Sequence, residues 1–201
     1  MNIIAHRINK IEQLKALPNK YGAEVDIRSK GGQLIIHHDP FSDGEDFEEW
    51  IKHYNHDMLI LNVKEEGLES RLIKLMNNKE ITSYFFLDQS FPFLIKWSKA
   101  GERRCAVRVS EYESIETALV LSKEIDWVWV DCFSKFPLTS AEYKILKNAG
   151  LRLCLVSPEL QGRDPVMGIT SMASFLIENH MVMDAVCTKR PDLWEKIRFP
   201  E

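Results

Sequence analysis

The chain has 201 residues, of which 45% are hydrophobic and 28% are charged, and its formal net charge at pH 7 is -4. This composition is typical of a globular domain, and the absence of a basic block argues against nucleic acid as a partner, because phosphate backbones are bound by clustered cations. No apolar run reaches the roughly 18 residues that a membrane span needs. Met1 to Ala5 leads directly into the polar His6-Arg7 without the apolar core of a signal peptide, so we expect a cytoplasmic protein.

Short apolar runs alternate with amphipathic segments along the whole chain. The runs predict strands at 2–6, 23–27, 58–64, 84–88, 105–109, 127–131, 151–156 and 185–188, with a hairpin extension at 34–37 that is joined through Gly31-Gly32. Helices are predicted at 10–20, 45–54, 68–76, 91–100, 140–149, 169–179 and 191–197. A further helix is expected to start at 110–113, where Ser110-Glu111-Tyr112-Glu113 fits a capping box.

Eight strands that alternate with helices predict an α/β protein, a compact single-domain (β/α)8 TIM barrel over residues 1–201. An open doubly wound sheet is the rival, but no Gly-x-Gly-x-x-Gly follows the first strand. The cysteines are widely spaced without a Cys-x-x-Cys pair, so we expect reduced thiols in the core rather than a zinc site: Cys105, Cys132, Cys154 and Cys187.

The stretch 22–40 carries the most chemically informative residues. Glu24 and Asp26 are two residues apart on an apolar run, so in a strand their side chains share one face. Beyond the glycine turn a second run ends in His37-His38-Asp39. Carboxylates and imidazoles at strand ends suit a hard divalent cation and acid–base catalysis. Other predicted strands also end in polar residues, which in a barrel share one mouth: His6, Asn62, Lys64, Asp88, Arg108, Asp131, Ser157 and Thr188.

These residues also have plain structural explanations. Glu24 or Asp26 alone is equally explained as an ion-pair partner of Arg28 or Lys64. Their alternation, together with two histidines, favours a functional role. Strand alternation turns His37 away from His38, so we interpret His37 as a packing or capping residue.

Five stretches that follow one another along the chain carry a resemblance to a known family. They are Ala5-His6-Arg7, Gly22 to Ile27, Ile36 to Pro40, Leu61 to Lys64 and Asp184 to Leu193. Together they resemble the glycerophosphodiester phosphodiesterase family and its phospholipase C-like barrel relatives, while the middle third matches only in its rhythm of strands and helices. The resemblance implies a short, divergent phosphoric diester hydrolase that acts in lipid or glycerol metabolism.

The resemblance also implies a role for individual residues. His6 and His38 become the acid–base pair, Arg7 and Lys64 bind phosphate, and Mg2+ or Ca2+ is held by Glu24, Asp26 and, at the third ligand position, Asn62. Arg108 is a further candidate for substrate binding at a strand end. These roles agree with the chemistry, because attack on an anionic phosphodiester needs positive charge, and imidazole titrates near working pH.

The chain departs from the family pattern at several positions. Asn62 stands where the family usually has a glutamate, and an amide oxygen brings no charge, so we expect modest metal affinity. Ile8 replaces a glycine, and Lys189 stands where the family often has aspartate. The segment before the third strand, which in many relatives carries an insertion, is only about 18 residues long.

Two functions of different classes therefore compete. The first is metal-dependent hydrolysis of a small-molecule phosphodiester, and the second is a catalytically weak or inactive barrel that binds a phosphorylated ligand or partner. Retention of both histidines favours the enzyme, because a binding pocket needs no proton-transfer pair. Metal-assisted hydrolysis of a carbon–nitrogen bond is disfavoured, since the first strand lacks a His-x-His pair. The sequence makes no prediction of the oligomeric state.

Overall fold

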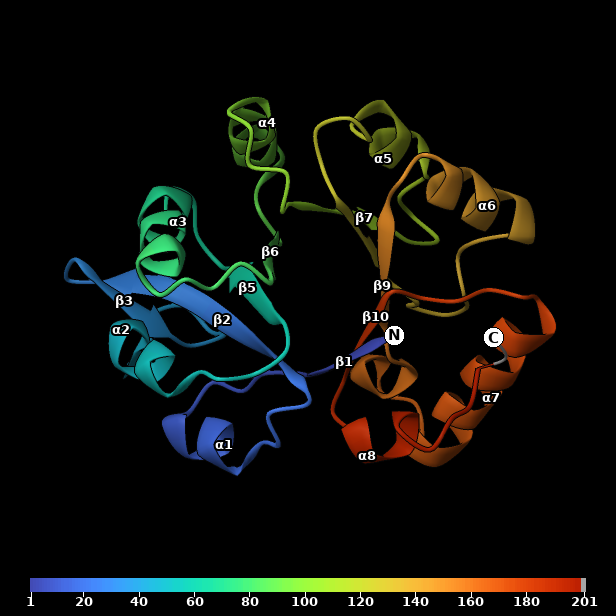
Figure 1. The fold of residues 1–201 in the computed structure, drawn as a ribbon, viewed down its shortest axis with the longest axis horizontal. Coiled ribbons are helices and arrows are strands. Elements are labelled where there is room, and N and C mark those ends of the chain that lie inside the picture. Colours follow the sequence, from blue (N-terminus) through green and yellow to red (C-terminus); the bar gives the residue numbers. More distant parts are fainter. Residues whose placement is uncertain (200–201) are drawn as a thin grey trace. The chain divides into compact units, whose positions relative to one another are not determined.

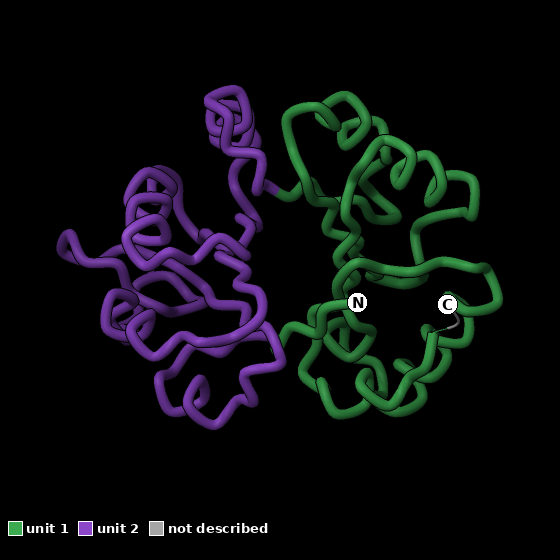
Figure 2. Tube along the Cα trace, viewed as in Figure 1, with its two compact units in different colours: residues 1–5, 106–201 green, residues 6–105 purple. Residues whose placement is uncertain are grey.

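The computed structural model describes residues 1–199. Contacts within the chain separate two compact units, of which unit 1 is Met1–Ala5 with Ala106–Glu201 and unit 2 is His6–Cys105 (Figure 2). The expected single domain over residues 1–201 stays a prediction. Within the described residues, no helix has the length and apolar character that crossing a membrane requires.

Unit 2 contains a mixed five-stranded sheet in the order β4-β3-β2-β5-β6. β2 (Gly22–Lys30), β5 (Leu59–Val63) and β6 (Tyr84–Leu87) run parallel, whereas β3 (Gln33–Ile36) and β4 (Glu45–Asp46) continue the sheet as antiparallel strands (Figure 1). The helices are α1 (Ile11–Ala16), α2 (Phe47–Trp50), the 3-10 turn η1 (Ile51–His53), α3 (Glu69–Asn78) and α4 (Phe91–Lys99).

Unit 1 contains five parallel strands in the order β1-β10-β9-β8-β7. They are β1 (Asn2–Ala5), β10 (Ala185–Thr188), β9 (Arg152–Val156), β8 (Trp127–Val130) and β7 (Ala106–Val109). Between them lie α5 (Glu116–Val120), α6 (Ser140–Asn148), the 3-10 turn η2 (Pro158–Gln161), α7 (Pro165–Glu178) and α8 (Pro191–Trp194), which packs against β1.

All the predicted strands form, and the hairpin turns where glycine was expected. Gly31 and Gly32 both have positive φ, at 57° and 82°, a conformation that glycine adopts without steric cost. The parallel strands β5, β6, β8 and β10 are buried throughout, as expected for a parallel sheet covered on both faces. The four cysteines are buried and free, which confirms the prediction of reduced core thiols.

Several helix boundaries were predicted wrongly. α1 ends at Ala16 rather than near residue 20, because Pro18 disfavours helical backbone at Leu17, which is extended. The stretch 110–113 is not a helix start: the Ser110 hydroxyl donates to the Glu113 carboxylate at 2.7 Å within a turn, and α5 begins only at Glu116. The predicted helix at 45–54 begins as the short strand β4.

Candidate active site

The adjacent strands β2 and β5 bring two carboxylates and an amide together inside unit 2, with Glu24 and Asp26 in the middle of β2 rather than at its end. Glu24 and Asp26 are fully buried, and the register between the two strands places Asp26 opposite Asn62. Asn62 Nδ2 donates to Glu24 Oε1 at 2.9 Å, and the backbone N–H of Arg7 donates to Glu24 Oε2 at 2.7 Å. His6 Nε2 lies 3.9 Å from the same Oε2. Three other predicted site residues, Asn62, Arg7 and His6, therefore lie around the Glu24 carboxylate.

The Asp26 carboxylate is surrounded by polar and cationic groups. Asn9 Nδ2 donates to Asp26 Oδ2 at 2.8 Å, and the backbone N–H of Asp26 donates back to Asn9 Oδ1 at 3.1 Å. Lys64 Nζ lies 3.4 Å from Asp26 Oδ1, and Arg7 Nε lies 3.7 Å from Oδ2. Lys64 also donates to Asp88 Oδ2 at 3.0 Å. The sequence alone allowed an ion pair with Lys64 as a purely structural explanation of Asp26, and this ion pair is present within the site.

Charge is not balanced around Glu24. Burial and, after it, the charge of Asp26 raise the pKa of Glu24 to about 7, although the hydrogen bonds from Asn62 and Arg7 oppose the shift. Two carboxylates that share a buried site favour protonation of one of them unless positive charge is supplied. Burial and the neighbouring carboxylate thus favour the protonated form of Glu24 unless further positive charge is supplied.

The backbone is held in the left-handed region at two points of the site. Arg7 has φ of 55° and Asp88 has φ of 58°, a conformation that costs a residue with a side chain of order 1 kcal/mol or more. At Arg7 this turn aims the backbone N–H at Glu24. Strain of this kind persists where the surroundings fix it, and it clusters at functional sites.

Arg28, on β2, connects the ends of two other strands. Its Nε and Nη2 donate to the carbonyl oxygen of His38 at 3.2 and 2.8 Å, and its Nη1 donates to the carbonyl oxygen of Lys64 at 3.2 Å. The alternative that paired Arg28 with Glu24 or Asp26 is wrong, because this guanidinium is occupied by backbone carbonyls. Arg28 fixes the positions from which His38 and Lys64 project.

His37 and His38 lie at the end of β3 and border one cavity of about 560 Å³. His38 Nδ1 is 2.8 Å from Asp39 Oδ1, which leaves Nε2 as the ring nitrogen for other partners. His37 Nδ1 accepts from the backbone N–H of Asp39 at 3.0 Å, the capping role expected for it. Gly44 closes the loop against β3, since a Cβ there would lie 2.2 Å from the Ile36 carbonyl oxygen.

The oxygen atoms of the site fit a hard divalent cation. Asp26 Oδ1 and Asn62 Oδ1 are buried without a hydrogen bond, and they belong to register partners on adjacent strands. Carboxylate and amide oxygens are ligands of Mg2+ and Ca2+. Within residues 1–199, no group of three or more His, Cys, Asp or Glu side chains is arranged to hold a metal, so a cation bound here would need an oxygen ligand of another kind, such as the amide of Asn62.

Arg108 is the one predicted site residue outside unit 2. It lies on β7 in unit 1, where its Nη1 donates to Asp131 Oδ2 at 2.7 Å. Gln161 Nε2 donates to Asp131 Oδ1, also at 2.7 Å. The predicted contact of Arg108 with substrate stays a prediction. Sequence reasoning missed Asn9 altogether and misassigned Arg28, because neither the Asn9–Asp26 pair nor the binding of carbonyls by Arg28 has a signal in residue spacing.

The comparisons with known proteins give a likeness of fold. No protein-family model matches the sequence, and no curated protein matches it. A glycerophosphodiester phosphodiesterase from Agrobacterium tumefaciens superposes with a TM-score of 0.70 at 14% identity, over 98% of this chain and 99% of that one. A glycerophosphoryl diester phosphodiesterase from Parabacteroides distasonis gives 0.62 at 13% identity, over 94% and 83%.

The chain has the fold of these phosphodiesterases. The predicted fold class, an α/β protein of the (β/α)8 TIM-barrel type, is thereby confirmed. The resemblance to glycerophosphodiester phosphodiesterases is also confirmed as far as it concerns the fold. At these identities the likeness concerns the fold alone, and the chemistry has to be argued from the residues of this chain.

Proposed function

We propose that this chain is a phosphoric diester hydrolase that cleaves a small-molecule, glycerophosphodiester-like substrate. The observation that carries the proposal is the buried Glu24–Asp26 pair, with Lys64 and Arg7 beside Asp26 and His6 beside Glu24. The fold shared with glycerophosphodiester phosphodiesterases supports it. Fixed positive charge next to a cation site is the arrangement that attack on an anionic phosphodiester requires.

Mg2+ or Ca2+ is the proposed cofactor, held by Glu24, Asp26 and the Asn62 amide oxygen. When bound, the cation would neutralise charge on the phosphate and polarise it towards attack. Burial holds both carboxylates rigidly for this role, and the Asn62 amide, which donates to Glu24 through Nδ2, presents Oδ1 beside them. Because Asn62 adds no charge, we expect weaker binding than by three carboxylates.

Proton transfer is assigned to His6 and His38. One imidazole removes a proton from the attacking oxygen while the other protonates the leaving alkoxide. The hydrogen bond from His38 Nδ1 to Asp39 orients that ring and leaves Nε2 for the reaction. Lys64 and Arg7 bind the phosphate oxygens, and Arg108 is proposed as a further substrate-binding cation.

The proposal is tested by assaying a panel of phosphodiesters with Mg2+, with Ca2+ and after chelation of divalent cations. We expect release of an alcohol and a phosphomonoester from at least one glycerophosphodiester, and loss of the reaction on chelation. Release in the presence of chelator would refute the metal, and no release from any phosphodiester would refute the enzyme. Residence in the cytoplasm, a role in lipid or glycerol metabolism and the absence of nucleic acid as a partner stay predictions.

A non-catalytic barrel that binds a phosphorylated ligand is the second candidate. The neutral Asn62 at the third ligand position favours it, because weak metal binding limits catalysis more than it limits phosphate binding by Lys64 and Arg7. The two candidates are separated by titrating the protein with glycerol 3-phosphate, since saturable binding without turnover of any phosphodiester supports the binding protein.

A further inference from the structure

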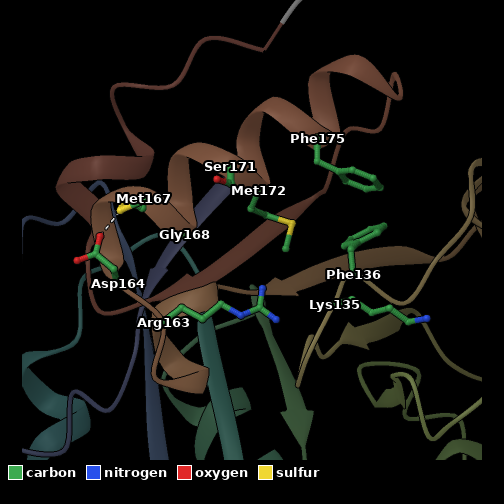
Figure 3. Close-up of a pocket in the computed structure, with 9 residues that line it drawn as sticks. All are labelled: Lys135, Phe136, Arg163, Asp164, Met167, Gly168, Ser171, Met172 and Phe175. Carbon is green, nitrogen blue, oxygen red and sulfur yellow. Dashed lines mark hydrogen bonds between the residues drawn. The ribbon is translucent and has the colours of Figure 1, made fainter.

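A second cavity lies wholly within unit 1, between α7 and the loop that follows β8. Its volume is about 660 Å³, within the range of roughly 300–1,000 Å³ that small-molecule sites occupy. Figure 3 shows the helix above the cavity and the loop residues Lys135 and Phe136 facing it. The lining residues are Lys135, Phe136, Arg163, Asp164, Met167, Gly168, Ser171, Met172 and Phe175.

One wall of this cavity is apolar and exposed. The rings of Phe136 and Phe175 pack with their centroids 5.3 Å apart, and Met172 points between them and Arg163 (Figure 3). Met167 is 73% exposed and Phe175 is 37% exposed. Methionine and aromatic side chains form a wall that adapts to flexible apolar ligands. The wall therefore fits an alkyl chain.

The opposite side of the cavity is cationic. The Arg163 guanidinium points into the cavity below Met172, and Lys135 lies along its edge below Phe136 (Figure 3). Within residues 1–199, neither side chain makes an ion pair, and the Arg163 guanidinium makes one long hydrogen bond of 3.4 Å, to the carbonyl oxygen of Cys132. The nearby Asp164 carboxylate is occupied in capping α7, where it accepts from the Met167 N–H at 2.8 Å. The cavity thus combines an apolar wall with a guanidinium that forms no ion pair, and its lining also includes the capping carboxylate of Asp164.

We propose that this cavity binds a single-chain amphipathic carboxylate, that is, a long-chain fatty acid. The carboxylate is received by the Arg163 guanidinium, whose planar fork matches two oxygen atoms, and Lys135 adds charge at the edge. The alkyl chain lies against Phe136, Met172 and Phe175. A peptide is a poorer occupant, because its backbone amides would lack hydrogen-bond partners on the apolar wall. The site is independent of the proposed hydrolase activity.

Calorimetric titration with three probes tests both parts of the ligand. Dodecanoate, kept below its micelle-forming concentration, carries chain and charge, dodecylamine carries the chain with the opposite charge, and acetate carries the charge alone. We expect saturable binding of dodecanoate and at least tenfold weaker binding of the other two. Equal affinity for dodecylamine would overturn the role of Arg163, and equal affinity for acetate would overturn the role of the apolar wall.

Variants locate the binding. Arg163→Gln is expected to weaken dodecanoate binding about tenfold, whereas Lys144→Gln, at an exposed position of α6, should leave it unchanged. If Arg163→Gln fails to fold, the matched pair Met167→Glu and Met167→Gln decides, because position 167 is exposed and only the glutamate repels the carboxylate. Equal affinity in both members of that pair, or dimerisation of the protein that dodecanoate does not reverse, would refute the proposal. Phosphodiester hydrolysis should be the same in all these variants.

Discussion

The sheets of both units carry polar residues, but the hydrogen-bonding groups of these residues find different partners in the two units. In unit 1 the groups bind one another: Asp131 accepts from Arg108 and Gln161, and Thr188 donates to Glu159 at 2.5 Å. In unit 2 Asn62 Oδ1 is buried without a hydrogen bond, whereas Asp26 Oδ1 has the ammonium of Lys64 at 3.4 Å. A buried polar atom without a partner costs about 1–3 kcal/mol, so its persistence calls for a ligand.

The difference shows what a polar residue at the end of a strand does and does not indicate. Their place in the predicted strands made Asp131 and Thr188 candidates in the same way as Glu24 and Asp26. Only the completeness of the hydrogen bonding separates the closed network of unit 1 from the cluster in unit 2 on which the proposed function rests. The comparison therefore predicts that substitutions in unit 2 act on chemistry.

The largest effect is expected from the proposed proton-transfer residues. His6→Ala and His38→Ala should each lower kcat/KM on a phosphodiester by roughly a hundredfold or more, the range of positioned acid–base catalysis. The double variant should lose little more than either single one, because both residues act in the same step. His37→Ala is the control and should remain near wild type. If His37→Ala were inactive and His38→Ala active, the acid–base residue would be His37 rather than His38.

A smaller loss is expected when the connection made by Arg28 is removed. Arg28→Met should lower kcat roughly tenfold, because the carbonyls of His38 and Lys64 lose a charged donor worth about 1.5–3 kcal/mol per hydrogen bond. Arg28→Lys is the matched variant, and it should not restore activity, since an ammonium cannot bridge the two carbonyls. Full rescue by lysine would show that charge alone matters at this position. Separate measurement of kcat and KM distinguishes lost positioning from lost binding.

Metal affinity should respond to the charge at position 62. Asn62→Asp is expected to raise Mg2+ affinity about tenfold, because affinity at oxygen sites follows the number of charged ligands. Without the cation, the same variant should lower Tm, since a third carboxylate joins two buried ones. Asn77→Asp, at an exposed position of α3, is the control for added charge.

The paired variant Glu24→Gln/Asp26→Asn should lose the heat of Mg2+ binding altogether. Isothermal titration calorimetry measures both this loss and the expected gain from Asn62→Asp. Unchanged binding in the paired variant would place the cation elsewhere.

The smallest effect is expected in unit 1, at Glu111. Its partial burial raises its pKa, but backbone hydrogen bonds from Lys135 and Ser134 and the Ser134 hydroxyl outweigh this effect and bring the pKa to about 2. The folded-state pKa is thus below the unfolded one of 4.5, so the stabilisation is present above pH 4.5 and is lost as the pH falls through 2.

Thermal denaturation as a function of pH measures this effect. Glu111→Gln should lower Tm at pH 7 by about 2 °C, a modest shift because the carboxylate is only partly buried and water screens its interactions. The difference from the wild type should shrink as the pH falls from 4.5 towards 2. Glu178→Gln, exposed in the last turn of α7, is the control. A difference that grows on acidification would contradict this account of Glu111.

Apolar runs predicted the strands well. A continuous run such as 127–130 indicates a buried strand by itself, because it does not depend on residues elsewhere in the chain. Helix ends were predicted less well, because they depend on single residues. Pro18 ended α1 early, and Asp164 started α7 at Pro165 rather than at 169, by accepting from the Met167 N–H. The hairpin through Gly31-Gly32 was predictable, since that turn needs positive φ.

The candidate site was predictable only in part. The alternation of Glu24 and Asp26 indicated a shared face, and the structure brings them together with Asn62 and Lys64 through the register of β2 and β5. The hydrogen bond between Asn9 and Asp26 joins residues 17 positions apart. The Arg28 side chain binds backbone carbonyls, which every residue has, so no residue type in the sequence marks its partners. Contacts of this kind follow from the folded backbone and leave no pattern in the sequence.

The division of the chain between the units has a consequence for the order of folding during synthesis. β1 is made before the rest of the unit 1 sheet, yet β10, with which it pairs in that unit, begins only at Ala185, so this pairing has to wait until β10 has been synthesised. Unit 2 is one continuous segment, and its strands can pair while the rest is still being made. When nascent chains are labelled by a pulse of hydrogen exchange, amides of β2 and β5 should therefore gain protection before those of β9 and β10.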